Sequence, residues 1–271
     1  MKNKNIVITG GCGFIGSNIA EYLSNYNNVT IIDNLSTGKK ENIKGINATF
    51  VKGDINDSNL LSEIFKDIDY VFHLAAIPSV PRSVKDPITT NNANINGTLN
   101  ILSVAKNTEV KKIIYSSSSS VYGDTPTLPK KENMKPCPLS PYAVSKLTGE
   151  YYCKVFTECY GLKTVSLRYF NVYGPRQDPN SEYAAVVPKF IKLVSNGKPP
   201  VVYGDGSQTR DFTYVGDVVN ANVLSAEHSD CTGVFNVAGG RRITINELAD
   251  SIIKNHGSDG GLSPVYECPR P

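Results

Sequence analysis

The segment that most constrains the fold lies at the amino terminus, where a short apolar run leads directly into a cluster of glycines. Ile6-Val7-Ile8-Thr9 has the character of a buried strand, and Gly10-Gly11-Cys12-Gly13-Phe14-Ile15-Gly16 follows it. Glycines at 11, 13 and 16 permit a tight turn, a close backbone approach to a ligand and close helix–strand packing, each of which excludes a side chain. The helix that follows presents free N–H groups to an anion. This opening predicts a dinucleotide-binding βαβ unit.

The chain continues this alternation of short β-branched runs and longer amphipathic ones. Strands are predicted at 5–9, 29–32, 48–52, 70–73, 112–117 and 163–168, and helices at 15–26, 60–65, 89–106 and 141–160. Such a rhythm is typical of an α/β fold with a Rossmann-type doubly wound parallel sheet.

After Gly174 the alternation becomes irregular, in a segment rich in proline, glycine and aspartate. Helices are expected at 185–194, 216–226 and 244–253, and strands at 201–203, 211–215 and 233–237. We therefore expect residues 1–173 to form the cofactor-binding domain, to which the chain returns around 213–240. Residues 174–271 are expected to form a smaller C-terminal substrate-binding lobe.

The second predicted strand ends in Asp33, where a carboxylate can accept hydrogen bonds from an adenosine ribose. The same carboxylate would repel a 2′-phosphate, which favours NAD over NADP. Asp54, after the third strand, fits a contact with adenine, and Leu74-Ala75-Ala76, after the fourth, fits a floor of small residues under the cofactor. Strand ends often carry such residues for structural reasons alone, so the alternative of ordinary strand termini stays open for both.

A second chemical signal is Tyr142 followed four residues later by Lys146, on one face of the helix predicted at 141–160. With 15 tyrosines in the chain this spacing also arises by chance. The pair follows the serine-rich end of the fifth strand, and this position favours a functional role, because ligands of such sheets bind at that edge. A phenol acts as a base near neutral pH only if its pKa falls by about 3 units. A neighbouring ammonium group and the helix amino terminus both favour that.

Composition excludes several other classes of function. The 28 basic and 25 acidic residues are evenly spread and give a net charge of +3, so neither nucleic acid nor a membrane surface is an expected partner. No apolar run reaches the ~18 residues of a membrane span, and we expect a cytoplasmic protein. The six cysteines and three histidines are scattered, which predicts neither a metal site nor a disulfide framework.

Arginine usage gives an independent indication of an anionic ligand. The chain has 7 arginines against 21 lysines, so an arginine kept in this background is of interest for its planar, bidentate geometry. Arg82, Arg210 and Arg270 all lie in predicted loops. Ordinary surface arginines are the alternative for each.

Taken together, these motifs resemble the extended short-chain dehydrogenase/reductase family. The resemblance rests on the glycine cluster, Asp33-Asn34, the serines before Val121-Tyr122-Gly123, the Tyr142/Lys146 pair and the stretches 167–175 and 204–212. Within that family the chain is most similar to UDP-glucose 4-epimerases, including relatives that act on N-acetylated UDP-sugars. The resemblance implies a tightly held NAD, a UDP-sugar substrate and a homodimer, for which apolar faces of the helices at 89–106 and 141–160 would serve.

The resemblance also implies roles for individual residues. Ser118 would bind the C4 oxygen of the sugar, Tyr142 would be the base, and Lys146 would hold the nicotinamide ribose and tune the tyrosine. The cofactor-binding set would be Gly10, Gly13, Phe14, Ile15, Gly16, Asp33, Asn34, Ser36, Thr37, Gly38, Asp54, Ile55, Leu74, Ala75, Ala76, Asn94, Ser116, Tyr142, Lys146 and Tyr169. The substrate-binding set would be Arg82, Ser118, Ser119, Asn171, Val187, Arg210, Phe212 and Arg270, with Asn171 and Arg210 on the diphosphate and Phe212 near the uridine.

The residues after Ser118 favour epimerisation over related reactions. Ser119, Ser120 and Val121 supply no carboxylate, whereas elimination of water needs a second acid or base beside the hydroxyl. A UDP-uronate epimerase, a dehydratase, a decarboxylase and a non-catalytic NAD-binding scaffold remain as alternatives. The end of the chain, Cys268-Pro269-Arg270-Pro271, resembles the start of an Arg-x-Gly-Asp segment whose last two residues are absent, so we expect the substrate-binding lobe to be truncated.

Overall fold

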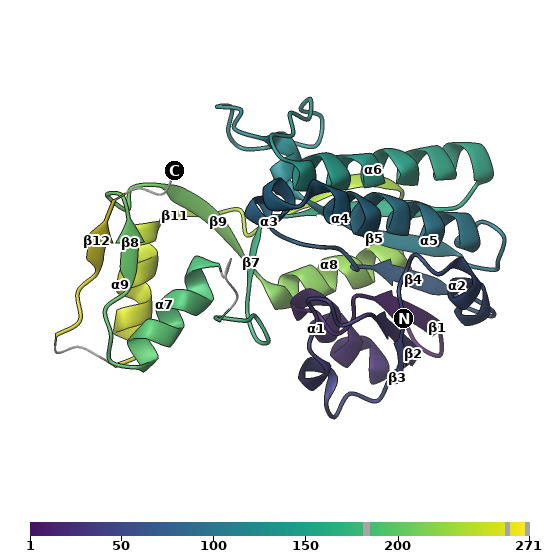
Figure 1. Cartoon of the computed structure of the whole chain (residues 1–271), viewed down its shortest axis with the longest axis horizontal. Helices are drawn as coiled ribbons and strands as arrows, with labels where there is room; N and C mark the ends of the chain where they lie inside the picture. The colour runs from purple at the N-terminus through teal and green to yellow at the C-terminus, as the bar shows by residue number, and fades with distance from the viewer. Residues whose placement is uncertain (181–184, 258–260, 269–271) are drawn as a thin grey trace. The chain divides into compact units, whose positions relative to one another are not determined.

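A computed structural model describes residues 1–180, 185–257 and 261–268 (Figure 1). It divides the chain into two compact units. Unit 1 comprises Met1–Tyr169 and Val215–Val237, and unit 2 comprises Phe170–Tyr214 and Ala238–Pro271. The chain therefore completes most of unit 1, builds part of unit 2, and returns to unit 1 for one helix and one strand.

Unit 1 contains a seven-stranded sheet in the order β10-β6-β5-β4-β1-β2-β3, in which every neighbouring pair is parallel. The order reverses direction at β1, as in a doubly wound sheet, so the predicted fold class is confirmed. The strands are β1 (Asn5–Thr9), β2 (Asn28–Asp33), β3 (Thr49–Lys52), β4 (Tyr70–His73), β5 (Lys112–Ser118), β6 (Thr164–Tyr169) and β10 (Gly233–Val237).

Helices cover both faces of this sheet (Figure 1). α1 and α8 pack together on one face, while α5 and α6 lie side by side on the other, where α2 packs against α5 and α3 and α4 pack against α6. The bounds are α1 (Phe14–Ser24), α2 (Ser58–Ile64), α3 (Val80–Lys85), α4 (Pro87–Asn91), α5 (Gly97–Ala105), α6 (Pro141–Tyr160) and α8 (Val215–Glu227).

The long helix α6 is defined at both ends by its sequence. The Ser140 side chain accepts a hydrogen bond from the Ala143 amide, with Pro141 at the first helical position, and Gly161 ends the helix with φ of 71°. Its buried face carries Lys146 and Glu150 among small and apolar residues. The helix thus turns two charged side chains toward the sheet.

The sequence predicted one helix over 89–106, and the structure differs there. The chain is helical from α4 to α5, but Asn92–Asn96 between them form a π-helical turn. A π-turn places one extra residue in the helix and is frequent at functional sites, yet it leaves the apolar pattern almost unchanged. The short helix α3 was not predicted, because six residues are too few to show a periodicity.

Unit 2 is a smaller assembly with its own core. β9 (Thr209–Tyr214) pairs parallel to β7 (Asn171–Tyr173) and antiparallel to β11 (Arg242–Thr244), while β8 (Val201–Tyr203) pairs with β12 (Val265–Glu267). α7 (Val186–Ser195) and α9 (Ile245–Asn255) pack together. The buried core of this unit consists of Val187, Phe190, Val202, Ile245, Leu248 and Ala249.

The turn that joins β1 to α1 is too tight for any side chain at two of its glycines. Gly10 has φ of +69°, and a Cβ there would lie 2.6 Å from the Ala75 amide nitrogen. A Cβ at Gly16 would lie 2.3 Å from the Gly10 carbonyl oxygen. The backbones of β1, α1 and the segment after β4 therefore touch directly, which brings three elements to one point at the sheet edge.

We expect Gly10→Ala to destabilise the protein through both strain and overlap. The left-handed backbone costs an alanine roughly 1 to 2 kcal/mol, and the overlap with Ala75 adds about 1 to 3 kcal/mol more. Gly45→Ala is the matched control, because Gly45 has φ of +82° but no heavy atom of the described residues within 4 Å of a Cβ. Urea unfolding would measure both changes. Equal losses for the two variants would contradict the close approach at Ala75.

Candidate active site

The amino end of α1 is open to a ligand. Gly13 precedes the helix, and none of the described side chains caps it there. A Cβ at Gly13 would meet only the Gly10 carbonyl oxygen, at 3.1 Å, among the atoms that are not its chain neighbours. The first N–H groups of a helix have no partner within it, and they favour an anion such as pyrophosphate. Phe14 and Ile15 stand in this first turn.

Asp33, at the end of β2, closes the side of this turn. Its Oδ2 accepts a hydrogen bond from the Cys12 amide at 2.9 Å, and its Oδ1 accepts one from the Leu35 amide at 2.8 Å. Burial raises the pKa of this carboxyl group, and the two backbone hydrogen bonds oppose that rise. Each carboxylate oxygen keeps a second lone pair, so Asp33 can also accept ribose hydroxyls.

The residues next to Asp33 form an exposed polar rim. Asn34 donates from its side-chain amide to Asp54 Oδ2 at 2.9 Å and accepts from the Ser36 amide at 2.9 Å. Ser36 and Thr37 are exposed, and Gly38 is half-buried, with the Asp33 carboxylate 2.8 Å from where its Cβ would stand. Ile55 is buried, in contrast to these neighbours, and packs on Gly97.

The segment after β4 is held by a single buried amide. Asn94, in the π-turn, accepts from the Ile77 amide at 2.7 Å and donates to the Ile77 carbonyl at 3.2 Å. Its side-chain nitrogen also donates to Ser145 Oγ at 2.9 Å. Because all these bonds are internal, Asn94 positions the segment that contains Leu74, Ala75 and Ala76, all of which are half-buried.

His73, the last residue of β4, continues this network toward the glycine turn. Its Nε2 lies 2.9 Å from Thr98 Oγ1, and Thr98 donates its one hydroxyl hydrogen to the Asn94 carbonyl at 2.6 Å. The proton of the imidazole must therefore be on Nε2, which leaves Nδ1 to accept from Thr9 Oγ1 at 2.7 Å. The Thr9 hydroxyl then accepts the Ala75 amide at 3.2 Å. Burial lowers the pKa of His73 to about 3.

Tyr142, Ser118 and Lys146 come together at the carboxyl end of β5. Ser118 lies beside the Tyr142 phenol and lowers the tyrosine pKa, but burial raises that pKa more. Lys146 Nζ donates to the Ser116 carbonyl at 2.6 Å and lies 6.0 Å from the centre of the Tyr142 ring. Burial lowers the pKa of Lys146 to about 8. The structure thus brings the three predicted catalytic residues into one cluster.

The backbone of Tyr142 is fixed from two directions. Its amide donates to Ser83 Oγ at 3.0 Å, and its carbonyl accepts from Ser145 Oγ at 2.8 Å. Ser83 belongs to α3 and is fully buried. Two hydroxyls that the sequence analysis did not single out therefore orient this tyrosine.

The remaining predicted residues of unit 1 lie near the same sheet edge. Ser119 begins a 3-10 turn, Ser119–Tyr122, directly after Ser118. Tyr169 ends β6, and its hydroxyl lies 3.0 Å from Asn222 Oδ1. Arg82 was predicted in a loop, and this was wrong, because it stands in α3, where Ser79 caps the helix and Pro81 is in the first turn.

Five of the predicted substrate residues belong to unit 2 or lie beyond its described part. Asn171 pairs with Phe212 in the register of β7 and β9, and its side chain donates to the Asp211 carbonyl at 2.9 Å. Arg210 was also predicted in a loop, wrongly, because β9 begins at Thr209, two residues before the predicted strand, and Arg210 pairs there with Ile243 of β11. Val187 is buried in the core of unit 2. Arg270 lies outside the described residues.

Several residues of the site carried no signal that the sequence analysis used. Ser83, Ser145, His73 and Thr98 are single polar residues in apolar surroundings, and nothing in the sequence indicates their partners. Glu150 is different, because it follows Lys146 by four residues and therefore shares the helix face of Tyr142 and Lys146. That spacing could have indicated it.

Two further properties follow from the described part of the chain. Within it, no His, Cys, Asp and Glu side chains gather in a group that could bind a metal ion. No helix described there combines the length and apolar character needed to cross a bilayer. All six cysteines are free thiols.

Comparison with known proteins agrees with this geometry. Residues 6–238 match the model of the NAD dependent epimerase/dehydratase family. A UDP-N-acetylglucosamine 4-epimerase of Methanobrevibacter ruminantium, solved in complex with UDP-N-acetylmuramic acid, is 52% identical with a TM-score of 0.95, covering 100% of this chain and 87% of that one.

Two other relatives are similar over nearly the whole chain. A putative UDP-glucose 4-epimerase of Methanocaldococcus jannaschii is 43% identical over 269 residues, which are 98% of this chain and 86% of the relative. The structure of a UDP-glucose 4-epimerase of Thermus thermophilus in complex with NAD is 38% identical with a TM-score of 0.88, covering 98% of this chain and 87% of that one.

We expect the buried imidazole of His73 to make the stability depend on pH. Its pKa falls from 6.5 in the unfolded chain to about 3 in the folded protein, so only the unfolded chain gains a proton as the pH drops below 6.5. The protein therefore loses about 2 kcal/mol of unfolding free energy between pH 7 and pH 5 from this residue.

Urea unfolding at several pH values would measure this dependence. His73→Gln should be less stable at pH 7 but should lose less of its stability at pH 5. His256→Gln, which removes an exposed imidazole, is the matched control and should keep the wild-type slope. An unchanged slope in His73→Gln would contradict a neutral, buried His73.

Proposed function

The chain belongs to the NAD dependent epimerase/dehydratase family, and we propose that it inverts the configuration at C4 of a UDP-hexose through a 4-keto intermediate. The observation that carries this proposal is the cluster of Tyr142, Ser118 and Lys146 beside an open glycine turn. UDP-glucose and UDP-galactose are the proposed substrates, and their N-acetylated forms are further candidates, because relatives named for both kinds of sugar are similar to this chain.

The residues around the glycine turn fit NAD. The glycine turn and the uncapped start of α1 suit the pyrophosphate, and Asp33 retains acceptor capacity for the two hydroxyls of an adenosine ribose. A bound NAD⁺ would supply the acceptor for the hydride of C4 and, once reduced, the donor that gives the hydride back to the other face of the sugar. We propose that Lys146 and Tyr169 border the nicotinamide side and Asn34 and Asp54 the adenine side.

Tyr142 would act as the one acid–base group of the reaction. In the forward step its phenolate accepts the proton of the 4-hydroxyl, and in the return step it gives the proton back to the 4-keto oxygen. Ser118 would hold that oxygen against the phenol. One residue used twice is sufficient, because epimerisation consumes and releases the same proton.

The electrostatics of Tyr142 depend on its charged surroundings. Burial raises its pKa, which keeps the phenol protonated, whereas the neighbouring Ser118 lowers it. The Lys146 ammonium and the positive charge of a nicotinamide ring both favour the phenolate further. We infer that Tyr142 becomes a competent base when the oxidised cofactor is bound, which restricts proton removal to the loaded enzyme.

The surroundings of Ser118 favour epimerisation over elimination of water. Positions 119 to 121 carry no carboxylate. Glu150 lies close to the end of β5, but Arg168 and Ser117 occupy both of its oxygens. Glu150 is therefore not a free acid, and among these residues an elimination would lack its proton donor.

Residues of unit 2 would hold the nucleotide part of the substrate. Arg210 is exposed and can offer its guanidinium to diphosphate oxygens, and Asn171 and Phe212 are register partners in the adjacent strand pair. Tight binding of the diphosphate with loose binding of the hexose would let the keto sugar rotate and present its other face.

We also propose that the enzyme lies in the cytoplasm, because its six cysteines are free thiols.

The decisive measurement is incubation of the protein with each of the four UDP-sugars, followed by proton NMR of the products. We expect interconversion at C4, and Tyr142→Phe should lower kcat at least about 1,000-fold, since it removes the only proposed base. Tyr160→Phe is the matched control, because Tyr160 is an exposed tyrosine on the same helix.

Each other outcome has a defined meaning. A 4-keto-6-deoxy product would identify a dehydratase. In a parallel incubation with a UDP-uronic acid, loss of carbon dioxide would identify a decarboxylase. If Tyr142→Phe turned over substrate as fast as the wild type, the catalytic assignment would be wrong.

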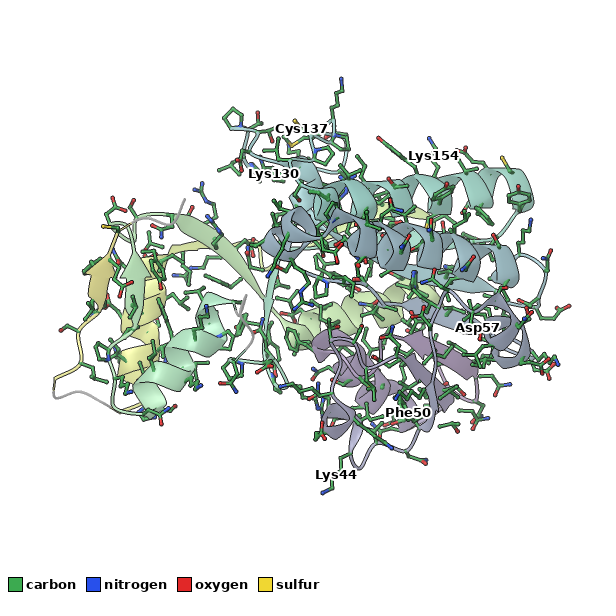
Figure 2. All side chains as sticks on the ribbon, in the orientation of Figure 1. Lys44, Phe50, Asp57, Lys130, Cys137 and Lys154 are labelled. Carbon is green, nitrogen blue, oxygen red and sulfur yellow. The ribbon has the colours of Figure 1, made fainter. Side chains whose placement is uncertain are left out.

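We further propose that the enzyme is a homodimer formed through α6. Val144, Tyr151 and Val155 lie on one side of this helix and are 46%, 56% and 45% exposed, and Ile88 in the neighbouring α4 is 72% exposed. Figure 2 shows Lys154, next to Val155, pointing from α6 away from the sheet. An apolar strip of this kind on a helix is typical of an interface.

We expect Val155→Lys to shift the protein from dimer to monomer in analytical ultracentrifugation, because the buried charge would be unpaired in the interface. Leu224→Lys is the control, since Leu224 is 53% exposed on α8, on the opposite face of the sheet. A dimer that withstands Val155→Lys would place the interface elsewhere, and dissociation by Leu224→Lys would move it to α8.

A further inference from the structure

The last three residues of β5 are each tied to a different residue of α6. The Ser116 carbonyl accepts from Lys146 Nζ at 2.6 Å. The Ser117 hydroxyl donates to Glu150 Oε1 at 2.5 Å, and Ser118 lies beside the Tyr142 phenol. Tyr142, Lys146 and Glu150 are spaced by four residues and so share one helix face. Two of these ties belong to the proposed chemistry, and the third, through Glu150, has no role in it.

Glu150 is a buried charge with all of its acceptor groups engaged. Its side chain is 2% exposed, and Arg168 Nε and Nη2 donate to its two oxygens at 2.9 Å and 2.7 Å. Arg168 is opposite Ser117 in the register of β5 and β6. The pair therefore links α6 to two adjacent strands at the level of the residue before Ser118.

The same pair also braces the chain on the other side of Ser118. The Arg168 guanidinium lies 4.7 Å from the centre of the Tyr122 ring, and Tyr122 ends the turn that follows Ser118. The Tyr122 hydroxyl in turn donates to Asn236 Oδ1 of β10 at 2.7 Å. Ser118 thus stands between two segments that Glu150 and Arg168 hold in place.

We infer that Glu150, together with Arg168, is a positioning residue that holds the end of β5 through Ser117, so that the Ser118 hydroxyl meets the Tyr142 phenol. The inference rests on the proposed function for its consequence in turnover, but the geometry it describes is independent of any substrate. Misplacement of a reacting group by ~1 Å costs up to about 100-fold in rate.

The physical chemistry of buried ion pairs supports a positioning role. Desolvation of two charges opposes folding, and well-packed apolar residues of similar size are often no less stabilising. Stabilisation of the fold alone therefore does not explain why a buried ion pair, Glu150 and Arg168, occupies this place. A bidentate pair has a fixed geometry, however, and it holds a hydroxyl that is hydrogen-bonded to it in a fixed position.

Ser117→Ala tests the inference without breaking the buried charge pair. We expect it to lower kcat at least about 10-fold, while KM and the amount of NAD that co-purifies stay unchanged. Ser117→Thr keeps the hydroxyl and should restore most of the rate. Ser166→Ala is the matched control, because Ser166 is buried in the next strand, opposite Tyr115 in the register, and is not among the described partners of Ser117 or Glu150.

A double-mutant cycle separates positioning from general loosening of the fold. If Ser117 acts through Ser118, Ser117→Ala should change kcat less than about twofold in a Ser118→Ala background. An equal fall in both backgrounds, a wild-type rate in Ser117→Ala, or a fall of the same size in Ser166→Ala would overturn the inference.

A crystal structure of Ser117→Ala keeps the test independent of the proposed reaction. If the wild-type protein turned over none of the UDP-sugars, the proposed function would fail, and this structure would still decide the positioning role. Loss of the contact between Ser118 Oγ and the Tyr142 hydroxyl supports it, and an unchanged contact overturns it.

Discussion

The close packing of α6 on β5 is the constraint on which the candidate site depends. Gly149 allows it, because a Cβ there would lie 2.2 Å from the Tyr115 hydroxyl. At this distance the Lys146 ammonium reaches the Ser116 carbonyl, and Tyr142 reaches Ser118. A helix even slightly farther from the sheet would leave a buried ammonium without its acceptor, which is costly in a low-dielectric interior. The contact between α6 and β5 therefore both packs the helix on the sheet and brings the proposed catalytic residues together.

Around this contact the protein buries polar groups in pairs and chains that satisfy one another. His73 is kept neutral between two threonines, and Asn94 uses its whole amide on Ile77 and Ser145. Such networks have a single arrangement in which every donor finds an acceptor, so they specify geometry more strongly than apolar contacts do. These side chains hold the backbone segments that face the glycine turn in position.

Much of the fold could be predicted because its signals are local. The strands of the central sheet and the helix at 141–160 follow from apolar periodicity and from caps such as Ser140 and Gly161. The glycine turn, Asp33 and the Tyr142/Lys146 pair were recognisable as well. Arg82 was misplaced because α3 is too short to show a period. Arg210 was misplaced because β9 begins two residues before the predicted strand, where it pairs with β11, a partner distant in the sequence. Glu150 was overlooked although its spacing was visible.

The sequence by itself determined the order of strands and helices, the turn that only glycine can make at position 10, and the residue types available for acid–base chemistry. These follow from backbone sterics and from hydrophobic periodicity, which act within a few residues. Only the tertiary structure decided which polar side chains meet. Ser83 reaches Tyr142 across 59 positions and His73 reaches Thr9 across 64. Such pairings depend on how the sheet and its helices pack, and no local pattern encodes them.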